Sequence, residues 1–211
     1  MIRCLVVDDH PAVRMGLLGL LEDQPDFVVL DAVATAEAAV AFAESNAIDV
    51  AVVDYQLGGR NGLWVSRKFK RLPEPPRVVI YSAYSDGILA AACVVAEADG
   101  LVSKARLGSE LCDAIRRVAQ GQLLLPTVRP ALADSMRRRL GSDEQAIFGM
   151  LLAGISPPEI AHTLGFSAGE LESSLWTMLR KLERLEVEPA ELLRNRSWVG
   201  TRRPTRLLTK G

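Results

Sequence analysis

The sequence is poor in cysteine and in aromatic residues, and it contains no long apolar run. Three cysteines in 211 residues are too few for a disulfide scaffold, and their spacing matches no metal site. The longest apolar run, residues 88–96, is far shorter than the roughly 20 residues of a membrane-spanning helix. No basic stretch at the start of the sequence leads into a long apolar one, so no secretory signal is expected. These absences predict a cytoplasmic protein with buried, reduced thiols and no membrane contact.

The chain also lacks an excess of charge of either sign, with 25 Lys and Arg against 26 Asp and Glu and a net charge of -1. That total alone argues against a nucleic-acid partner. Counted by segment, however, the net charge alternates: -4 for residues 1–122, +3 for 123–139, -5 for 140–188 and +5 for 189–211. The alternation indicates two acidic folded regions, the first followed by a basic connector and the second by a basic tail.

The first 120 residues alternate short β-branched runs with longer amphipathic stretches. The runs lie at 4–7, 28–32, 50–53, 78–81 and 100–102, and the predicted helices at 11–22, 35–45, 62–70, 87–96 and 109–120. Continuous apolar runs are typical of parallel strands buried on both faces, and right-handed crossovers place a helix between successive strands. The predicted fold is α/β, a doubly wound five-stranded parallel sheet, with a small all-α domain after it.

Polar side chains follow the predicted strands at their carboxyl ends. Asp8 and Asp9 follow the first strand, Asp54 the third, Ser82 the fourth and Lys104 the fifth. Doubly wound sheets bind their ligands at this edge. Three carboxylates brought together need a hard cation such as Mg²⁺, beside which a carboxylate can attack a phosphoryl donor. The sequence therefore predicts a magnesium site at which one of the aspartates accepts a phosphoryl group and becomes an aspartyl phosphate.

Four segments carry a family resemblance. LVVDDHPAVRMGL, AVVDYQLGGRNG, VVIYSAY and ADGLVSKA resemble, in order and spacing, the receiver domain of bacterial two-component response regulators. The resemblance covers residues 1–120 and implies a flavodoxin-like receiver domain that a histidine kinase phosphorylates. The implied site consists of Asp54 as phosphoacceptor, Asp8, Asp9, Asp54 and the backbone carbonyl of Gln56 as Mg²⁺ ligands, Ser82 as switch hydroxyl and Lys104 as phosphate-binding lysine.

Three further positions qualify this resemblance. Leu101 stands where the family commonly has an aromatic residue that turns inward on phosphorylation, and Tyr81 and Tyr84 are the nearest candidates to replace it. His10 is interpreted as a loop residue that caps or packs and does not react. Position 56 is Gln, so an aspartate-nucleophile phosphatase lacks its general acid there, and the chain is predicted not to be an enzyme beyond slow self-dephosphorylation.

Residues 121–139 are predicted to be a linker with a short helix over 130–139, because Pro126 and Pro130 interrupt any longer helix. Residues 140–188 then predict three helices. Ser142 is expected to cap the first and Gly154 to end it, and Gly165 is expected to end the second. A capping box opens the third helix, whose apolar face consists of Leu171, Leu175, Met178, Leu179 and Leu182.

The segment LLAGISPPEIAHTLGFS, with LRKL after it, resembles the LuxR-type helix-turn-helix of the NarL/FixJ subfamily of response regulators. This implies transcriptional control through DNA, with a homodimer expected on phosphorylation. The expected DNA contacts on the third helix are Ser173, Ser174, Thr177, Arg180 and Lys181.

Electrostatics oppose that implication, because Glu170 and Glu172 stand where a recognition helix usually carries basic or polar donors. Two hypotheses stay open. Either the domain binds DNA with help from the basic linker and tail, or it is a phosphorylation-controlled interaction or dimerisation module that has lost DNA. Arg180 and Lys181 would in the second case pair with glutamates of their own helix. The tail, residues 189–211, is expected to be disordered.

Overall fold

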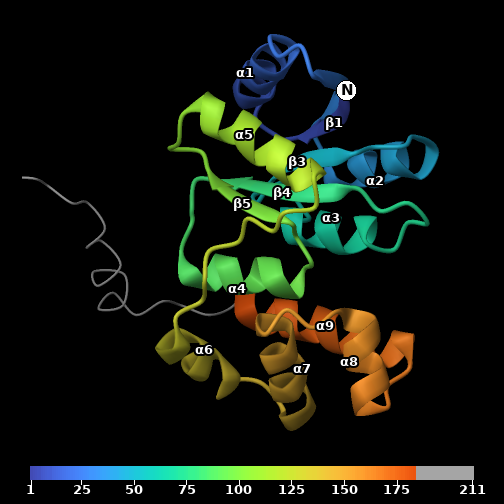
Figure 1. Cartoon of the computed structure of the whole chain (residues 1–211), viewed down its shortest axis with the longest axis vertical. Coiled ribbons are helices and arrows are strands. Elements are labelled where there is room, and N and C mark those ends of the chain that lie inside the picture. Colours follow the sequence, from blue (N-terminus) through green and yellow to red (C-terminus); the bar gives the residue numbers. More distant parts are fainter. Residues whose placement is uncertain (184–211) are drawn as a thin grey trace, which may run out of the picture.

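The computed structural model of the chain describes residues 1–183, which form a five-stranded parallel sheet covered by helices and a second, helical domain packed against it (Figure 1). The strands are β1 (Ile2–Val7), β2 (Phe27–Val33), β3 (Val50–Asp54), β4 (Arg77–Ser82) and β5 (Gly100–Ser103). Their order is β2-β1-β3-β4-β5, all parallel. The predicted doubly wound sheet is confirmed, and its switch point lies between β1 and β3.

Five helices cover the two faces of the sheet: α1 (Pro11–Glu22), α2 (Ala36–Ser45), α3 (Gly62–Phe69), α4 (Gly87–Val95) and α5 (Gly108–Ala119). Successive residues of a strand point to opposite faces. In β1, Cys4 and Val6 pack with α1 and α5, whereas Leu5 and Val7 pack with α2, α3 and α4. The central strand β3 is buried along its whole length, whereas the edge strand β2 is mostly half-buried and exposes Asp31. The three cysteines are buried and free, as predicted.

Local signals set the beginning of three of these helices. Thr35, Asn61 and Asp86 are N-caps whose side-chain oxygens accept hydrogen bonds from backbone N–H groups of α2, α3 and α4. Gly62 begins α3 so close to β3 that a Cβ atom there would collide with the backbone of Asp54. A glycine is thus required at this point for α3 to lie against the end of β3.

The linker does not begin as a free connector. The backbone of Leu124 bonds to Asp99 and Leu101 and forms a parallel bridge with Gly100, so the first part of the linker lies along the edge of β5. Only then does the chain leave the sheet and form α6 (Pro130–Arg137), two residues shorter than expected. The part of the linker between the sheet edge and α6 is therefore limited to residues 125–129.

The helical domain consists of α7 (Ser142–Leu152), α8 (Pro157–Leu164) and α9 (Ala168–Glu183). The helices begin and end as the sequence predicted, with one correction. Gly141, not Ser142, is the N-cap of α7, and its N–H donates a hydrogen bond to Glu144. Gly165 is left-handed and ends α8, and Ser167 and Glu170 form the predicted capping box of α9. The predicted apolar face of α9 is buried throughout.

The two domains share one hydrophobic core. The buried residues of α9 and α7 belong to the same apolar cluster as those of α3, α4 and one face of the sheet. Figure 1 shows α9 lying directly against α4, with α6 and α7 beside it. No helix among residues 1–183 is long and apolar enough to cross a membrane. The basic tail, and the end of the predicted helix-turn-helix region at 184–188, lie outside the described residues.

Candidate phosphorylation site and the α9 surface

The carboxyl edge of the sheet brings together four of the side chains singled out by sequence. Asp54 is the last residue of β3, Asp8 directly follows β1, and both carboxylates are buried. Lys104 follows β5, and its Nζ lies 2.7 Å from Asp8 Oδ2 and 3.0 Å from Asp54 Oδ2. Its backbone N–H also donates to the carbonyl of Ser82 at the end of β4. One ammonium therefore bridges two carboxylates from neighbouring strands at the switch point.

Burial and charge oppose each other in this cluster. Burial raises the pKa of Asp54 above its ordinary value, although the hydrogen bond and charge of Lys104 act in the other direction. Burial also lowers the pKa of Lys104, but its hydrogen bonds to Asp8 and Asp54 outweigh this and leave the pKa raised. The carboxylate of Asp54 is thus held in a partly desolvated site, next to a lysine that stays charged.

The acidic residues fit a divalent cation. Asp8, Asp9, His10 and Asp54 each offer a ligand atom, and these atoms lie within 4.8 Å of one another. Asp9 Oδ2 accepts a hydrogen bond of 3.0 Å from the N–H of Gly58, which ties the loop after β3 to this cluster. Carboxylate oxygens at such spacing suit Mg²⁺, which takes oxygen ligands and keeps waters for its other positions. The donor set therefore fits the predicted Mg²⁺ site.

His10, interpreted from the sequence as a loop residue that caps or packs, also belongs to this group. It occupies the N-cap position of α1, but its side chain makes no capping hydrogen bond and is mostly exposed. Its Nδ1 instead lies 2.6 Å from Asp9 Oδ1. The adjacency of His10 to the aspartate pair in the sequence was the only available signal.

Ser82 and its neighbours lie at the same edge of the sheet. Ser82 is buried, and its Oγ accepts a hydrogen bond of 3.0 Å from the N–H of Tyr84. The half-buried ring of Tyr81 lies 5.6 Å from Lys104 Nζ, whereas Tyr84 is exposed. Leu101 is buried in the core beside the linker. Tyr81, not Tyr84, is therefore the aromatic side chain in contact range of the site.

Four of the five polar residues expected to contact DNA make contacts within the helical domain. Ser173 donates to the carbonyl of Gly169, and Thr177 donates to that of Ser173. Arg180 is exposed and donates to Thr177, and Ser174 is half-buried. Lys181 pairs with Glu144 of α7 at 2.5 Å. Lys181 therefore pairs with another helix, and Glu186 and Glu188, two of the glutamates expected to pair with Arg180 and Lys181, lie outside the described residues.

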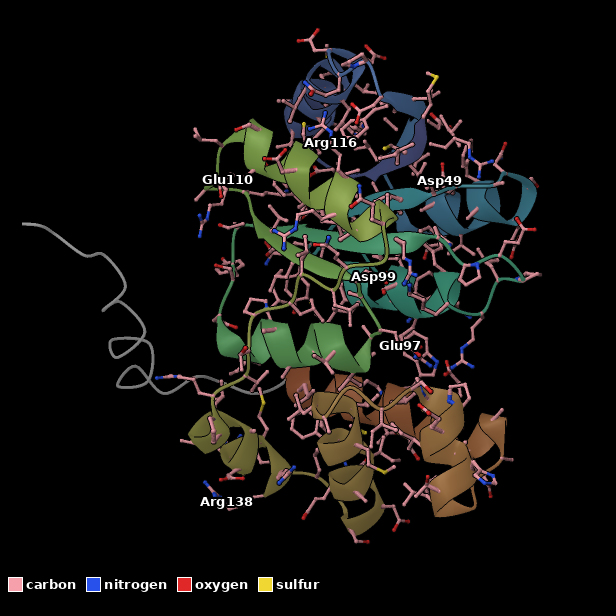
Figure 2. The ribbon with its side chains drawn as sticks, viewed as in Figure 1. Asp49, Glu97, Asp99, Glu110, Arg116 and Arg138 are labelled. Atoms are coloured by element: carbon pink, nitrogen blue, oxygen red, sulfur yellow. The ribbon has the colours of Figure 1, made fainter. Side chains whose placement is uncertain are left out.

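A buried ion network between the domains was missed by the sequence reading. Arg67 of α3 is fully buried and pairs with Glu97, just after α4, and with Glu172 of α9; Arg71 also pairs with Glu172. Figure 2 shows Glu97 at the junction of the two domains. Near the end of α9, Asn61 donates to Glu183 at 2.6 Å. No periodicity signals such a network, because its members lie on separate elements.

Comparisons with known proteins agree with this architecture. Residues 4–116 match the model of the response regulator receiver domain family. The chain is 30% identical to the response regulator UvrY of Escherichia coli over 192 residues, covering 86% of this chain and 88% of the relative. It is 29% identical over 194 residues to DevR/DosR of Mycobacterium tuberculosis, a DNA-binding transcriptional activator, covering 86% of this chain and 88% of the relative.

A solved structure adds to these relatives. The crystal structure of a two-component response regulator of the LuxR family from Aurantimonas sp. is 29% identical, with a TM-score of 0.56, and covers 63% of this chain and 92% of that one. The match to the receiver family, the order of the two domains and the relatives that cover most of the chain all indicate the same family. The chain belongs to the bacterial response regulators, in the LuxR-type NarL/FixJ subfamily.

Proposed function

We propose that the chain is a phosphorylation-controlled transcription regulator in which a histidine kinase phosphorylates Asp54 and the helix-turn-helix domain acts on DNA. The observation that carries the proposal is the Asp8–Lys104–Asp54 arrangement at the switch point of the sheet. The proposed domains are a receiver over residues 1–120, a linker over 121–139, the helix-turn-helix over 140–188 and a basic tail over 189–211.

Asp54 would act as the nucleophile. One of its carboxylate oxygens attacks the phosphorus of a phosphohistidine, and the nitrogen–phosphorus bond breaks as the oxygen–phosphorus bond forms. The imidazole nitrogen keeps the bonding electrons and takes up a proton. Asp8, Asp9, Asp54 and the backbone carbonyl of Gln56 would hold Mg²⁺, which when bound supplies charge neutralisation between carboxylate and phosphoryl group. The site makes the chain a phosphoryl acceptor and not a turnover enzyme, apart from slow self-dephosphorylation.

Lys104 and Ser82 would then bind the product. Lys104 already contacts Asp54, so its ammonium is placed to pair with phosphoryl oxygens attached there. The hydroxyl of Ser82 lies at the same strand edge and has its donor hydrogen free to rotate toward a new acceptor. Both residues would be drawn toward the phosphoryl group, which biases the position of the segments after β4 and β5.

The test of the phosphorylation step is metal-dependent labelling of the full chain. Incubation with acetyl phosphate and Mg²⁺ should give a covalent, alkali-labile adduct that adds the mass of one phosphoryl group in intact mass spectrometry. Chelation of Mg²⁺ with EDTA should remove nearly all of the adduct, because the carboxylates then repel the incoming phosphoryl group. Equal labelling with and without EDTA would contradict the proposed metal site.

The proposed output is DNA binding by the helical domain, with a homodimer forming on phosphorylation. Support comes from the family membership and from DevR/DosR, whose name states that it binds DNA. In the structure Glu172, in the first turns of α9, contacts the receiver, whereas Ser173 and Arg180 are exposed. Ser173, Thr177 and Arg180 are the α9 residues left for base or phosphate contacts once Lys181 is paired with Glu144.

A second candidate function is favoured by one observation, the engagement of Glu172 by two receiver arginines. In this alternative the helical domain no longer binds DNA and serves as a phosphorylation-controlled interaction module. Binding of random duplex DNA, measured between about 50 and 200 mM salt, separates the two, because each phosphate contact steepens the salt dependence.

The same measurement on a chain that ends at residue 188 separates the tail from the helices. If α9 binds DNA, the shortened chain should retain binding with a smaller salt slope. If only the basic tail attracts DNA, the chain that ends at residue 188 should not bind DNA. Absence of binding by the phosphorylated full chain even at the lowest salt would leave the interaction module as the function.

A further inference from the structure

The surface of α9 that faces the receiver has the chemistry of a protein-docking surface. Leu179 and Leu182 line hollows shared with residues of the receiver, and the carboxylate of Glu172 lies between Arg67 and Arg71. A carboxylate within an apolar rim is unfavourable against DNA, which carries one negative charge per ~1.7 Å of its axis. It is favourable against a pair of guanidinium groups.

The receiver presents the complementary surface. Arg67 lies in α3 and Arg71 lies just after its end, and both guanidinium groups reach the same carboxylate of Glu172. Arg67 is completely buried, with Glu97 on one side and Glu172 on the other. Removal of Glu172 from this position would leave Arg67 with a single carboxylate in a site shielded from water. The charge of Arg67 therefore favours the docked position of α9.

Apolar packing of α4, the helix between the two domains, also stabilises the docked position of α9. From Gly87 to Val95, α4 contains no charged side chain, and its residues from Leu89 to Cys93 are all buried. One side of α4 packs on the sheet and the other on α6, α7 and α9. Undocking α9 would expose apolar surface of α4 to water, at a cost that grows with the area exposed.

We propose that Glu172 is a specificity-determining residue that directs α9 to the receiver's own Arg67 and Arg71 instead of to DNA phosphates. Glu172 acts twice: it stabilises the docked helix, and it repels DNA from the undocked one. Because the same carboxylate attracts the receiver arginines and repels DNA phosphates, docking of α9 on the receiver and binding of α9 to DNA oppose each other by charge. The inference rests on the proposed phosphorylation-controlled function, in which phosphorylation must overcome this contact before α9 is available.

The test compares two variants of the full chain, Glu172→Gln and Glu170→Gln. Each removes one negative charge from the first turns of α9, and glutamine at position 170 can keep the capping box. Amide hydrogen exchange in α4 reports docking, because α4 is covered by α9. We expect exchange in α4 to rise about tenfold in Glu172→Gln, corresponding to loss of a charged hydrogen bond, and to stay unchanged in Glu170→Gln.

A third variant, Arg71→Gln, removes a partner of Glu172 from the receiver side and leaves the charge of α9 intact. Arg71 is partly exposed, so its replacement should not unfold the chain, and it should also speed exchange in α4. The affinity of each variant for duplex DNA is measured as well. The proposal would be overturned if hydrogen exchange in α4 were equal in Glu172→Gln and Glu170→Gln. It would also be overturned if both variants gained the same affinity for DNA. Faster exchange in α4 without any DNA binding would support the docking role and contradict the DNA-binding function instead.

Discussion

Replacing Asp54 with asparagine is expected to abolish phosphoryl incorporation from acetyl phosphate. Asparagine keeps the size and most hydrogen bonds of the side chain, including acceptance from the N–H of Gln56, but it has no nucleophilic carboxylate oxygen. The loss should be complete because Asp54 is the carboxylate shared by Lys104 and the loop after β3. Intact mass spectrometry after incubation with Mg²⁺ measures the labelled fraction directly.

The matched control is Asp113→Asn on α5. Asp113 is largely exposed and, among residues 1–183, pairs with Arg116 on its own helix, so labelling should equal that of the unmodified chain. Asp8→Asn should retain the nucleophile but weaken labelling, since one proposed metal ligand is lost while Asp9 and Asp54 remain. Undiminished labelling of Asp54→Asn at a single site would place the phosphoacceptor elsewhere and contradict the proposed site.

The sequence predicted the sheet and the convergence of Asp8, Asp54 and Lys104 for a common reason. Both depend on short-range patterns: apolar runs define strands, and residues at strand ends meet at one edge because the strands are parallel. Asp8, Asp54 and Lys104 therefore come together as soon as the fold is known. Errors in the strand ends were small and did not move any of these residues to another edge.

The contacts between the domains depend on information that no local pattern contains. Glu172 was recognised as unsuitable for DNA, but its partner Arg67 lies 105 residues away, on a helix predicted only as amphipathic. Asp99 is a similar case: it binds Lys70, Arg77 and the N–H of Val78 at the edge of the sheet near the linker (Figure 2). The uninterrupted apolar character of α4 was the one signal that a further layer covers the receiver.

Arg67→Met is expected to lower the free energy of unfolding by about 3–5 kcal/mol, the usual cost of removing one partner from a buried ion pair. Methionine fills much of the same volume, so the loss reflects charge more than packing. Glu97 and Glu172 would remain next to each other without the buried guanidinium. Urea unfolding of the full chain measures the change. Arg116→Met is the control: Arg116 is paired at the surface with Asp26, and its removal should cost about 1 kcal/mol or less.

Two further measurements identify the cause of that loss. The triple variant Arg67→Met, Glu97→Gln, Glu172→Gln removes the uncompensated charges and should recover most of the stability. Burial already raises the pKa of Glu97, against the effect of Arg71 and Lys70, and removal of Arg67 should raise it further. A carboxyl with a raised folded-state pKa is destabilising when ionised, so the deficit of Arg67→Met should shrink as the pH falls through that pKa. A deficit that is independent of pH and persists in the triple variant would mean that Arg67 acts by packing and not by its charge.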